Sequence, residues 1–462
     1  MLNGEVLQEL IKVIGAENIL TEQEDLLTYA YDATAAMKHK LPDVVVSPLS
    51  TEQVADIIKI AARHKVPIYP RGSGTNLSGG TIPLEGGIVL SMLNMDKILE
   101  VDQDNLTATV QPGLIIQALN DEAAKHGLLY PPDPGTITTA TMGGSVSECS
   151  GGLRGLKYGV TKHYIMGLQL VLANGEIIRW GGKTVKNVTG YDLVALFTGS
   201  EGTLGIITEI IVKLIPAPEA RKSIMAVFDN VDKAGNAIAA IIRNKVIPAT
   251  LEIMDNVTIQ TVENFVHAGL PMDAEAVLLC EVDGYKEVVE RESVLVERIL
   301  KEEGAVEVKI AKNDKERDLL WLARRSALPA LAQKRPTTVL EDATVPRSKI
   351  PDMLKAIRRI ATKHDLQIAT FGHAGDGNLH PTILTDDRDV EEMKRVDLAV
   401  EEIFETAIAL GGTLSGEHGI GIAKMKFLDW EFGEAGVAAL RRIKEALDPN
   451  YLLNPGKIVR RD

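Results

Sequence analysis

A glycine-rich loop directly after a predicted strand is the feature that most constrains the fold of this chain. Residues 44–46 are predicted as a short buried strand, Ser50 begins an amphipathic helix that ends near His64, and residues 66–70 are predicted as a second strand. The loop Pro70–Gly80 (PRGSGTNLSGG) follows at once. Such a loop presents several backbone N–H groups, which commonly hold phosphate oxygens. This β-α-β beginning predicts a nucleotide-binding unit.

Two familiar kinds of phosphate loop are excluded by single residues. A Rossmann fingerprint would need glycine where Leu77 stands, and a P-loop would need lysine where Gly80 stands. On this segment alone, a flexible loop without a ligand remains the alternative. A second small-residue stretch, residues 131–136 and 141–152, favours an extended ligand with a diphosphate in its middle. FAD has that shape.

The rest of the chain divides by pattern. Residues 1–40 are predicted to be helical, with a capping box at residues 21–24 opening the second helix. Short β segments between Gly and Asn turns then run to Pro216–Pro218, the first predicted domain boundary, and include a hairpin at Asn174-Gly175. Beyond it, predicted strands and long helices alternate, which indicates a separate α+β domain with a mostly antiparallel sheet. Those strands are 223–228, 276–282 and 368–371, and the helices are 232–244, 287–303, 349–364 and 389–410.

Length and composition narrow the class of protein. A chain of 462 residues and 50.0 kDa is expected to form two or three domains. Its net charge of −14 argues against a nucleic-acid partner. No apolar run of membrane-spanning length occurs and the N-terminus does not resemble a signal peptide, so we expect a cytoplasmic protein without a membrane span. Two cysteines, Cys149 and Cys280, are too few for an iron–sulfur cluster, so any redox chemistry needs an organic cofactor.

A second motif predicts a divalent metal site. The run His373–His380 (HAGDGNLH) and the pair Glu417-His418 supply two imidazoles and a carboxylate, and the turn Gly375–Gly377 lets the chain fold back so that both imidazoles meet. We therefore predict His373, His380 and Glu417 as metal ligands, with Zn, Fe(II) and Mn equally suitable. The adjacent His418 is predicted to be a general base. The alternative is a buried polar turn of hydrogen-bonded histidines.

Taken in order, six motifs resemble one known family. They are Arg71-Gly-Ser-Gly-Thr75, Pro132-Asp-Pro-Gly135, Gly202-Thr-Leu-Gly205, Gly372–His380, Gly416–Gly421 and Leu453–Lys457. The chain resembles the FAD-dependent 2-hydroxyacid dehydrogenases of the vanillyl-alcohol oxidase superfamily. Within them it is similar to the D subunits of glycolate oxidase and to D-lactate dehydrogenases, including those linked to an electron-transfer flavoprotein. The match covers essentially the whole chain.

The resemblance implies an α+β fold of three parts. These are a vanillyl-alcohol-oxidase/PCMH-type FAD-binding domain at 1–217, a substrate-binding cap domain with an antiparallel sheet at 218–415, and a C-terminal segment at 416–462 that returns to the flavin. FAD is expected to be non-covalent, because Thr75 and Asn76 stand in the loop where covalent members carry His or Cys. The implied FAD contacts are Arg71, Gly72, Ser73, Gly74, Thr75, Asn76, Pro132, Asp133, Gly135, Thr136, Met142, Gly143, Ser147, Gly151, Gly152, Glu201, Gly205, Ile206 and Asn454.

The resemblance also implies a reaction. A short D-2-hydroxy acid, with D-lactate to pyruvate favoured, would lose its hydroxyl proton to His418 beside the metal and a hydride from C2 to flavin N5. Arg324 matches the family's carboxylate-binding arginine, although Arg325 could share the role and a solvated helix face is the alternative. Leu340 stands where the related D-2-hydroxyglutarate enzymes carry lysine, which argues against a second substrate carboxylate.

Several alternatives remain open at this level. The substrate could be glycolate or another 2-hydroxy acid, the chain could be a non-catalytic FAD subunit that relays electrons, or it could be a metal hydrolase with an incidental glycine loop. Because the chain carries no haem or cluster motif, the electrons are expected to leave for an electron-transfer flavoprotein, an iron–sulfur subunit or a quinone-like acceptor.

Overall fold

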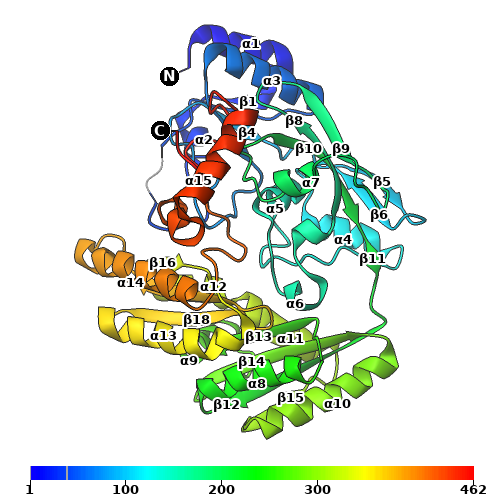
Figure 1. The fold of residues 1–462 in the computed structure, drawn as a ribbon, viewed down its shortest axis with the longest axis vertical. Coiled ribbons are helices and arrows are strands. Elements are labelled where there is room, and N and C mark those ends of the chain that lie inside the picture. Colours follow the sequence, from blue (N-terminus) through cyan, green and yellow to red (C-terminus); the bar gives the residue numbers. More distant parts are fainter. Residues whose placement is uncertain (1, 38–39, 462) are drawn as a thin grey trace. The chain divides into compact units, whose positions relative to one another are not determined.

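The computed structural model describes residues 2–37 and 40–461, and the chain divides into two compact units. The first unit contains Met1–Ser150, Val160–Ala217 and Glu417–Asp462, and the second contains Gly151–Gly159 and Pro218–Gly416. Figure 1 colours the chain from blue to red, so the return of the red C-terminal helix to the blue and cyan elements of the first unit can be followed there. Within the described ranges, no helix is both long and apolar enough to cross a membrane.

The first unit is built on two sheets. One has the order β1-β2-β4-β3, in which β2 and β3 both run parallel to β4, and the other has the antiparallel order β5-β6-β10-β8-β9. Their strands are β1 Ile19–Leu20, β2 Val44–Val46, β3 Ile68–Arg71, β4 Ile88–Ser91, β5 Ile98–Asp102, β6 Thr107–Val110, β8 Ile165–Val171, β9 Ile177–Gly181 and β10 Ile206–Lys213. Two further short strands of the first unit, β7 Leu128–Leu129 and β11 Ile215–Pro216, pair with each other in antiparallel fashion.

The helices of the first unit follow from local signals. Their bounds are α1 Gly4–Ile14, α2 Gln23–Leu27, α3 Thr51–His64, α4 Ile116–Ala124, α5 Met142–Glu148, α7 Leu193–Phe197 and α15 Leu428–Leu447, the last broken at Gly433. The side chain of Ser50 accepts from Gln53 N, which confirms the predicted start of α3. The predicted capping box at residues 21–24 is wrong. The N-cap of α2 is Glu22, with no side-chain cap, and β1 interrupts the helical region predicted for 1–40. Positions 1, 38 and 39 of that region lie outside the described residues.

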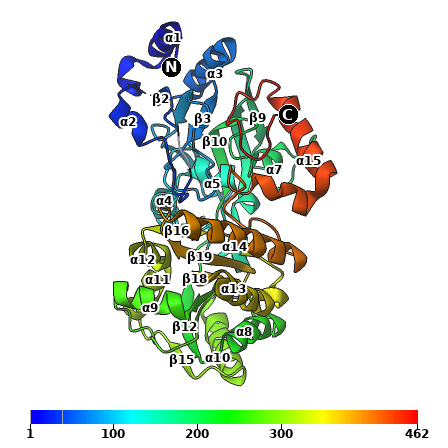
Figure 2. The same cartoon turned by 90° about the vertical axis from the view of Figure 1, so that its left-hand side faces the viewer.

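The second unit contains one eight-stranded sheet in which every described pair is antiparallel (Figure 2). The path runs β15-β12-β14-β13-β18-β19-β16, and β17 pairs with β19. Its strands are β12 Ala220–Phe228, β13 Thr250–Asp255, β14 Ala276–Gly284, β15 Glu307–Ile310, β16 Thr337–Leu340, β17 Ala343–Thr344, β18 Gln367–His373 and β19 Asn378–Thr385. The predicted antiparallel sheet is therefore present.

Both faces of this sheet are buried. On β12, Ile224, Ala226 and Phe228 join one apolar cluster while Met225 and Val227 join another. This alternation follows from the two-residue period of a strand, and a continuous apolar run is what a sheet covered on both sides requires. The helices are α8 Val231–Arg243, α9 Asn256–Val266, α10 Lys286–Glu302, α11 Asp314–Arg325, α12 Ala327–Lys334, α13 Ile350–His364 and α14 Val390–Ala409.

A short excursion of the chain, residues 151–159, belongs to the second unit. It carries helix α6 (Gly155–Tyr158), whose Leu156 packs in the apolar cluster of α8, α10 and α13. Lys157 Nζ donates to Asp283 O over 2.6 Å, and Tyr158 Oη donates to Asp283 Oδ2 over 2.7 Å. The glycine stretch that begins near residue 141 is therefore divided between the two units, because Gly151 and Gly152 belong to the second unit together with α6.

The C-terminal tail pairs with the strand that leads into the glycine-rich loop. Ile68 N donates to Leu452 O over 2.8 Å, and Asn454 N donates to Ile68 O over 2.7 Å. Asp448 accepts from the backbone N–H groups of Leu452 and Leu453, and the buried Lys444 bonds to Asp448. The turn-rich tail is thus fixed against β3 by backbone pairing.

Candidate functional site

The glycine-rich loop lies close to the beginning of helix α5. A Cβ atom at Gly72 would overlap the hydroxyl of Thr141, which caps α5 by accepting from Gly144 N over 3.2 Å. A Cβ at Gly143 would come within 2.6 Å of Pro112 Cβ. The two small-residue stretches therefore meet in one place within the first unit, and side chains are excluded where they meet.

Polar side chains inside the loop hold its shape. Arg71 is buried, and its Nη1 donates to Tyr31 O over 2.7 Å and to Thr81 Oγ1 over 3.1 Å. Asn76 Nδ2 donates to Asp32 Oδ2 over 3.0 Å. Gly74, with φ of 71°, has no room for a side chain beside the Arg71 guanidinium. The side chains of Arg71 and Asn76, both predicted to contact FAD, thus form bonds that stabilise the loop itself.

Glu201 binds the backbone of the segment after the predicted base His418. Its carboxylate accepts from Ile420 N over 2.6 Å and from Gly421 N over 2.8 Å. Burial raises the pKa of this carboxyl, while those two N–H groups oppose the rise. Glu201 was predicted to contact FAD, but its carboxylate is committed to the backbone of residues 420–421.

A second acid, the half-buried Glu148, has a buried carboxylate oxygen near Glu201. Burial, followed by the charge of Glu201, raises the pKa of Glu148 well above its usual value. A Cβ atom at Gly419 would overlap the Glu148 carboxylate, so this segment needs glycine. Sequence reasoning missed Glu148, because an acidic residue in the last turn of a short helix gives no distinctive signal.

The side chain of Asn454 has one buried polar atom that an organic cofactor could bond. Its Nδ2 donates to Gly80 O over 2.8 Å and to Glu201 O over 2.7 Å, whereas its buried Oδ1 has no hydrogen-bond donor among the described residues. A buried acceptor without a donor is costly, and an N–H group of a bound ligand would satisfy it. This unsatisfied acceptor, and the close approach of Gly72 to Thr141, fit the predicted binding of FAD at this place.

The remaining predicted FAD contacts occupy varied environments. Gly135 and Thr136 are exposed, Ser147 is half-buried and accepts from Glu201 N through its carbonyl, and Ser73 and Thr75 are half-buried in the loop. The buried members of the set are Pro132, Asp133, Met142, Gly143, Gly151, Gly152, Gly205 and Ile206. Gly151 and Gly152 belong to the second unit. Their roles as FAD contacts remain predictions.

In the second unit, the histidine motif forms a hairpin. His373 ends β18, His380 lies on β19, and the strands pair with Phe371 opposite His380 and His373 opposite Asn378. The two imidazoles therefore lie diagonally on one face, with ring centroids 5.1 Å apart. Gly375 has no room for a side chain because Leu156 of α6 packs against it. The predicted fold-back of the chain is confirmed.

His373 and the predicted substrate arginine share one acid. His373 Nδ1 lies 2.8 Å from Glu252 Oε1, and Arg324 Nε donates to Glu252 Oε2 over 2.7 Å. Burial would raise the pKa of Glu252, but the charges and hydrogen bonds of His373 and Arg324 outweigh it and hold the pKa below its usual value. Arg324 also lies over the ring of Phe371, 4.8 Å from its centroid.

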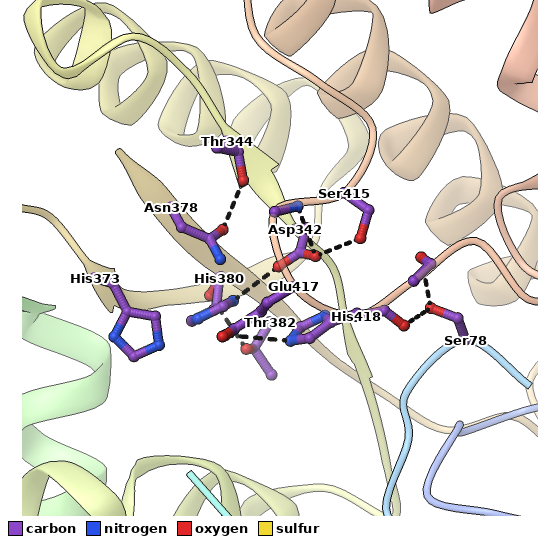
Figure 3. Close-up of polar contacts among 12 residues, drawn as sticks. Ser78, Asp342, Thr344, His373, Asn378, His380, Thr382, Ser415, Glu417 and His418 are labelled. Carbon is purple, nitrogen blue, oxygen red and sulfur yellow. Dashed lines mark hydrogen bonds and ion pairs between the residues drawn. The ribbon is translucent and has the colours of Figure 1, made fainter. Parts of the chain in front are cut away.

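Four side chains form a cluster that could hold a cation. Asp342, His380, Glu417 and His418 each offer one ligand atom, and these atoms lie within 4.8 Å of one another. Figure 3 shows Asp342 beside His380 and Glu417 beside His418. Ser415 Oγ and Gly416 N both donate to Asp342 Oδ2, over 2.9 and 3.2 Å, which anchors the chain just before Glu417. Imidazole and carboxylate groups suit a divalent transition metal.

The metal ligands predicted from the sequence and the four residues of the cluster overlap in part. His380 and Glu417 lie in the cluster, whereas His373 lies outside it and bonds to Glu252. Asp342 was not predicted, and the predicted base His418 has a ligand atom within the cluster. An isolated aspartate after a strand gives no metal signal in a sequence. A glutamate between the apolar residues Leu251 and Ile253 could, however, have drawn attention to Glu252.

Comparison with known proteins decides the family. Residues 217–458 match the family of FAD-linked oxidases, C-terminal domain, and residues 42–181 match the FAD binding domain. The glycolate oxidase subunit GlcD of Bacillus subtilis is 52% identical over 462 residues, covering 100% of this chain and 98% of that protein. The chain belongs to the FAD-linked oxidases.

A second relative and a solved structure are also similar to this FAD-linked oxidase. A D-lactate dehydrogenase of Anaerostipes hadrus is 36% identical over 466 residues, covering 97% of this chain and 96% of that protein. The solved structure of p-cresol methylhydroxylase with substrate bound has a TM-score of 0.82 at 20% identity, covering 99% of this chain and 96% of that chain. The second similarity is one of fold alone, and it confirms the predicted vanillyl-alcohol-oxidase/PCMH-type fold.

Membership decides two of the open questions. The predictions of FAD as cofactor and of an FAD-dependent oxidoreductase are confirmed for this FAD-linked oxidase. The metal-hydrolase alternative is excluded, because both family matches are to FAD proteins and together they span most of the chain. The glycine-rich loop at residues 70–80 lies within the matched FAD binding domain.

Proposed function

We propose that this FAD-dependent 2-hydroxyacid dehydrogenase oxidises a short D-2-hydroxy acid, with D-lactate to pyruvate favoured. The observation that carries the proposal is the cluster of Asp342, His380, Glu417 and His418 in a chain of the FAD-linked oxidase family. The names of the two relatives described above, a glycolate oxidase subunit and a D-lactate dehydrogenase, support a 2-hydroxy acid. The preference for the D enantiomer rests on the family resemblance.

Bound FAD would supply the acceptor for a hydride, and a bound divalent metal would supply a Lewis acid for the substrate's oxygen atoms. His380 and Glu417 are proposed to hold the metal, with His373 as the third predicted ligand and Asp342 as a further donor. His418 is proposed to accept the hydroxyl proton at an imidazole nitrogen. Loss of that proton and of a hydride from C2 converts the hydroxy acid to a 2-oxo acid, and bound FAD would take up the two electrons.

Arg324 is proposed to orient the substrate through its carboxylate. A guanidinium group suits a carboxylate because its N–H groups form a planar fork. Leu340 packs against the apolar cluster of α9, α11 and α12 and puts no cation at its position, which supports a substrate with one carboxylate. A short monocarboxylic acid such as lactate or glycolate is therefore favoured over a 2-hydroxy dicarboxylate.

Glycolate is the second candidate substrate, because the more similar of the two relatives is a glycolate oxidase subunit. Anaerobic mixing with D-lactate, L-lactate, glycolate and D-2-hydroxyglutarate, followed by flavin bleaching, ranks the candidates. We expect the fastest bleaching with D-lactate or glycolate. If none of the four acids bleaches the flavin, the proposed function is wrong.

The electron acceptor is proposed to be an electron-transfer flavoprotein or an iron–sulfur subunit, and the FAD is proposed to be dissociable. Acid precipitation should release yellow flavin into the supernatant, whereas flavin left in the pellet would contradict non-covalent binding. Turnover with a dye acceptor but not with NAD is expected. Efficient NAD reduction by the pure protein would contradict the need for a partner.

A further inference from the structure

Glu252 is a buried acid in the middle of strand β13, between the apolar residues Leu251 and Ile253. It lies on β13, between β14 and β18, and its side chain is 1% exposed. Its neighbours Leu251 and Ile253 point to the cluster of α8, α10 and α13, so Glu252 faces the opposite side with Met254. A carboxylate there costs stability unless it is paired, and therefore its partners indicate why it is present.

Two basic side chains share this one carboxylate. Arg324 contributes Nε at 2.7 Å and Nη2 at 2.6 Å from Oε2, and His373 Nδ1 lies 2.8 Å from Oε1 and 3.0 Å from Oε2. Arg324 and His373 are themselves almost entirely buried. Glu252 therefore fixes the predicted substrate arginine relative to a predicted metal ligand, although the two come from different elements, α11 and β18.

The contact also selects the form of the His373 ring. A carboxylate accepts, so Nδ1 carries the hydrogen and donates to Glu252, which leaves Nε2 as the ring nitrogen that could bind a metal. A histidine whose second nitrogen donates to a carboxylate is oriented and made more basic as a metal ligand. The ring lies beside that of His380, the other predicted histidine ligand.

We infer that Glu252 is a positioning residue that holds His373 ready to bind metal through Nε2 and holds Arg324 ready to bind the substrate carboxylate. This inference rests on the proposed function, in which His373 and Arg324 have those roles. Glu252 itself touches neither substrate nor metal. It acts through its two partners, so its loss should weaken two different binding events at once.

The test compares Glu252→Gln with Glu281→Gln in the full-length FAD protein. Glu281 is a matched control, because it is a buried carboxylate on the adjacent strand β14 and bonds instead to Ser223 and Trp321. Binding of Mn(II) to metal-stripped protein is measured by electron paramagnetic resonance. KM and kcat for D-lactate and glycolate are measured with a dye acceptor, and the flavin-to-protein ratio is measured by absorbance.

We expect Glu252→Gln to weaken Mn(II) binding about 10- to 100-fold, as loss of a carboxylate behind a histidine ligand does, and to raise KM by a similar factor. The flavin-to-protein ratio should stay at the wild-type value, and Glu281→Gln should leave both binding constants within about twofold of wild type. If Glu252→Gln does not fold, Glu252→Asp keeps the charge on a shorter arm and should show the same two losses at smaller size.

Each result decides a separate question. Wild-type Mn(II) affinity and KM in a folded Glu252 variant would overturn the inference. Absence of Mn(II) binding by the wild-type protein would overturn its metal half. If the wild-type protein binds Mn(II) but no hydroxy acid bleaches its flavin, the proposed function fails, while weaker Mn(II) binding in the Glu252 variants still supports the positioning of His373.

Discussion

Ser78 Oγ donates a hydrogen bond to the backbone carbonyl oxygen of His418 over 2.8 Å, across 340 residues of sequence (Figure 3). The same hydroxyl lies 3.2 Å from the carbonyl oxygen of Gly419, and Glu201 bonds the next two backbone N–H groups. The predicted base is thus attached by its backbone to the glycine-rich loop. Within the first unit, the FAD-binding sequence and the start of the C-terminal segment form one bonded structure.

Removing this hydroxyl should disturb catalysis more than folding. Ser78→Ala is expected to lower kcat about fivefold, the effect of one hydrogen bond of about 1 kcal/mol, while the flavin content stays unchanged. Ser223→Ala is the control, because Ser223 is equally buried and bonds to Glu281 instead. The melting temperature of both variants should be slightly lower than that of the wild-type protein. An unchanged kcat in Ser78→Ala would show that the bond does not position His418.

The role of His418 can be separated from that of a metal ligand. His418→Asn is expected to lower kcat about 10²- to 10⁴-fold, as loss of a general base does, while bound metal and flavin remain. Metal content by mass spectrometry and flavin absorbance are measured on the same sample. His126→Asn, at a surface histidine, should behave as wild type. Loss of metal from His418→Asn would instead assign His418 to the metal, as its place in the cluster would allow.

Asp342 is expected to be a metal-binding residue. Asp342→Asn should lower the bound metal and the activity together, because an amide is a poorer ligand than a carboxylate for a divalent cation. Dialysis of the wild-type protein against a chelator should likewise remove activity without removing flavin, and Mn(II), Zn(II) or Fe(II) should restore it. Asp352→Asn, at an exposed aspartate paired with Lys349, is the control. Full metal content in Asp342→Asn would contradict the prediction.

Local features of this fold could be predicted from the sequence. Ser50 caps α3, the turn at Asn174-Gly175 joins β8 to β9, and the Gly375–Gly377 turn brings His373 to His380, because each depends on residues a few positions apart. Turns and helix caps depend on the types of residues that are neighbours in the sequence, so they can be predicted from sequence patterns.

The partners of the candidate site residues could not be predicted. Glu252 meets His373 across 121 residues, and Asp342 meets Gly416 across 74. Such pairs depend on the order of strands in the sheet, and no periodicity records that order. The predicted Thr21 capping box is displaced by one residue: α2 has Glu22 as its N-cap, and Ile19 and Leu20, just before Thr21, pair as β1 with β2.

Lys457 should make the stability of the protein depend on pH in the alkaline range. It is 1% exposed, its Nζ donates to Ile82 O over 2.7 Å, and it lies 5.1 Å from the centroid of the Tyr69 ring. Burial lowers its pKa to about 7, although the charges of Glu201, Asp32 and Glu85 act in the opposite direction. In an unfolded chain the pKa of lysine is about 10.4.

The sign of the effect follows from these two values. Between about pH 7 and pH 10 the unfolded chain binds a proton that the native protein does not, so raising the pH stabilises the native state, by at most about 1.4 kcal/mol per pH unit. Lys457→Met lacks this linkage. The melting temperature of wild type minus that of Lys457→Met should therefore rise steadily from pH 7 to pH 9.5. Lys355→Met, at an exposed lysine paired with Asp232, should show a constant difference from wild type. A constant difference for Lys457→Met as well would mean that Lys457 keeps its proton in the folded protein throughout this range.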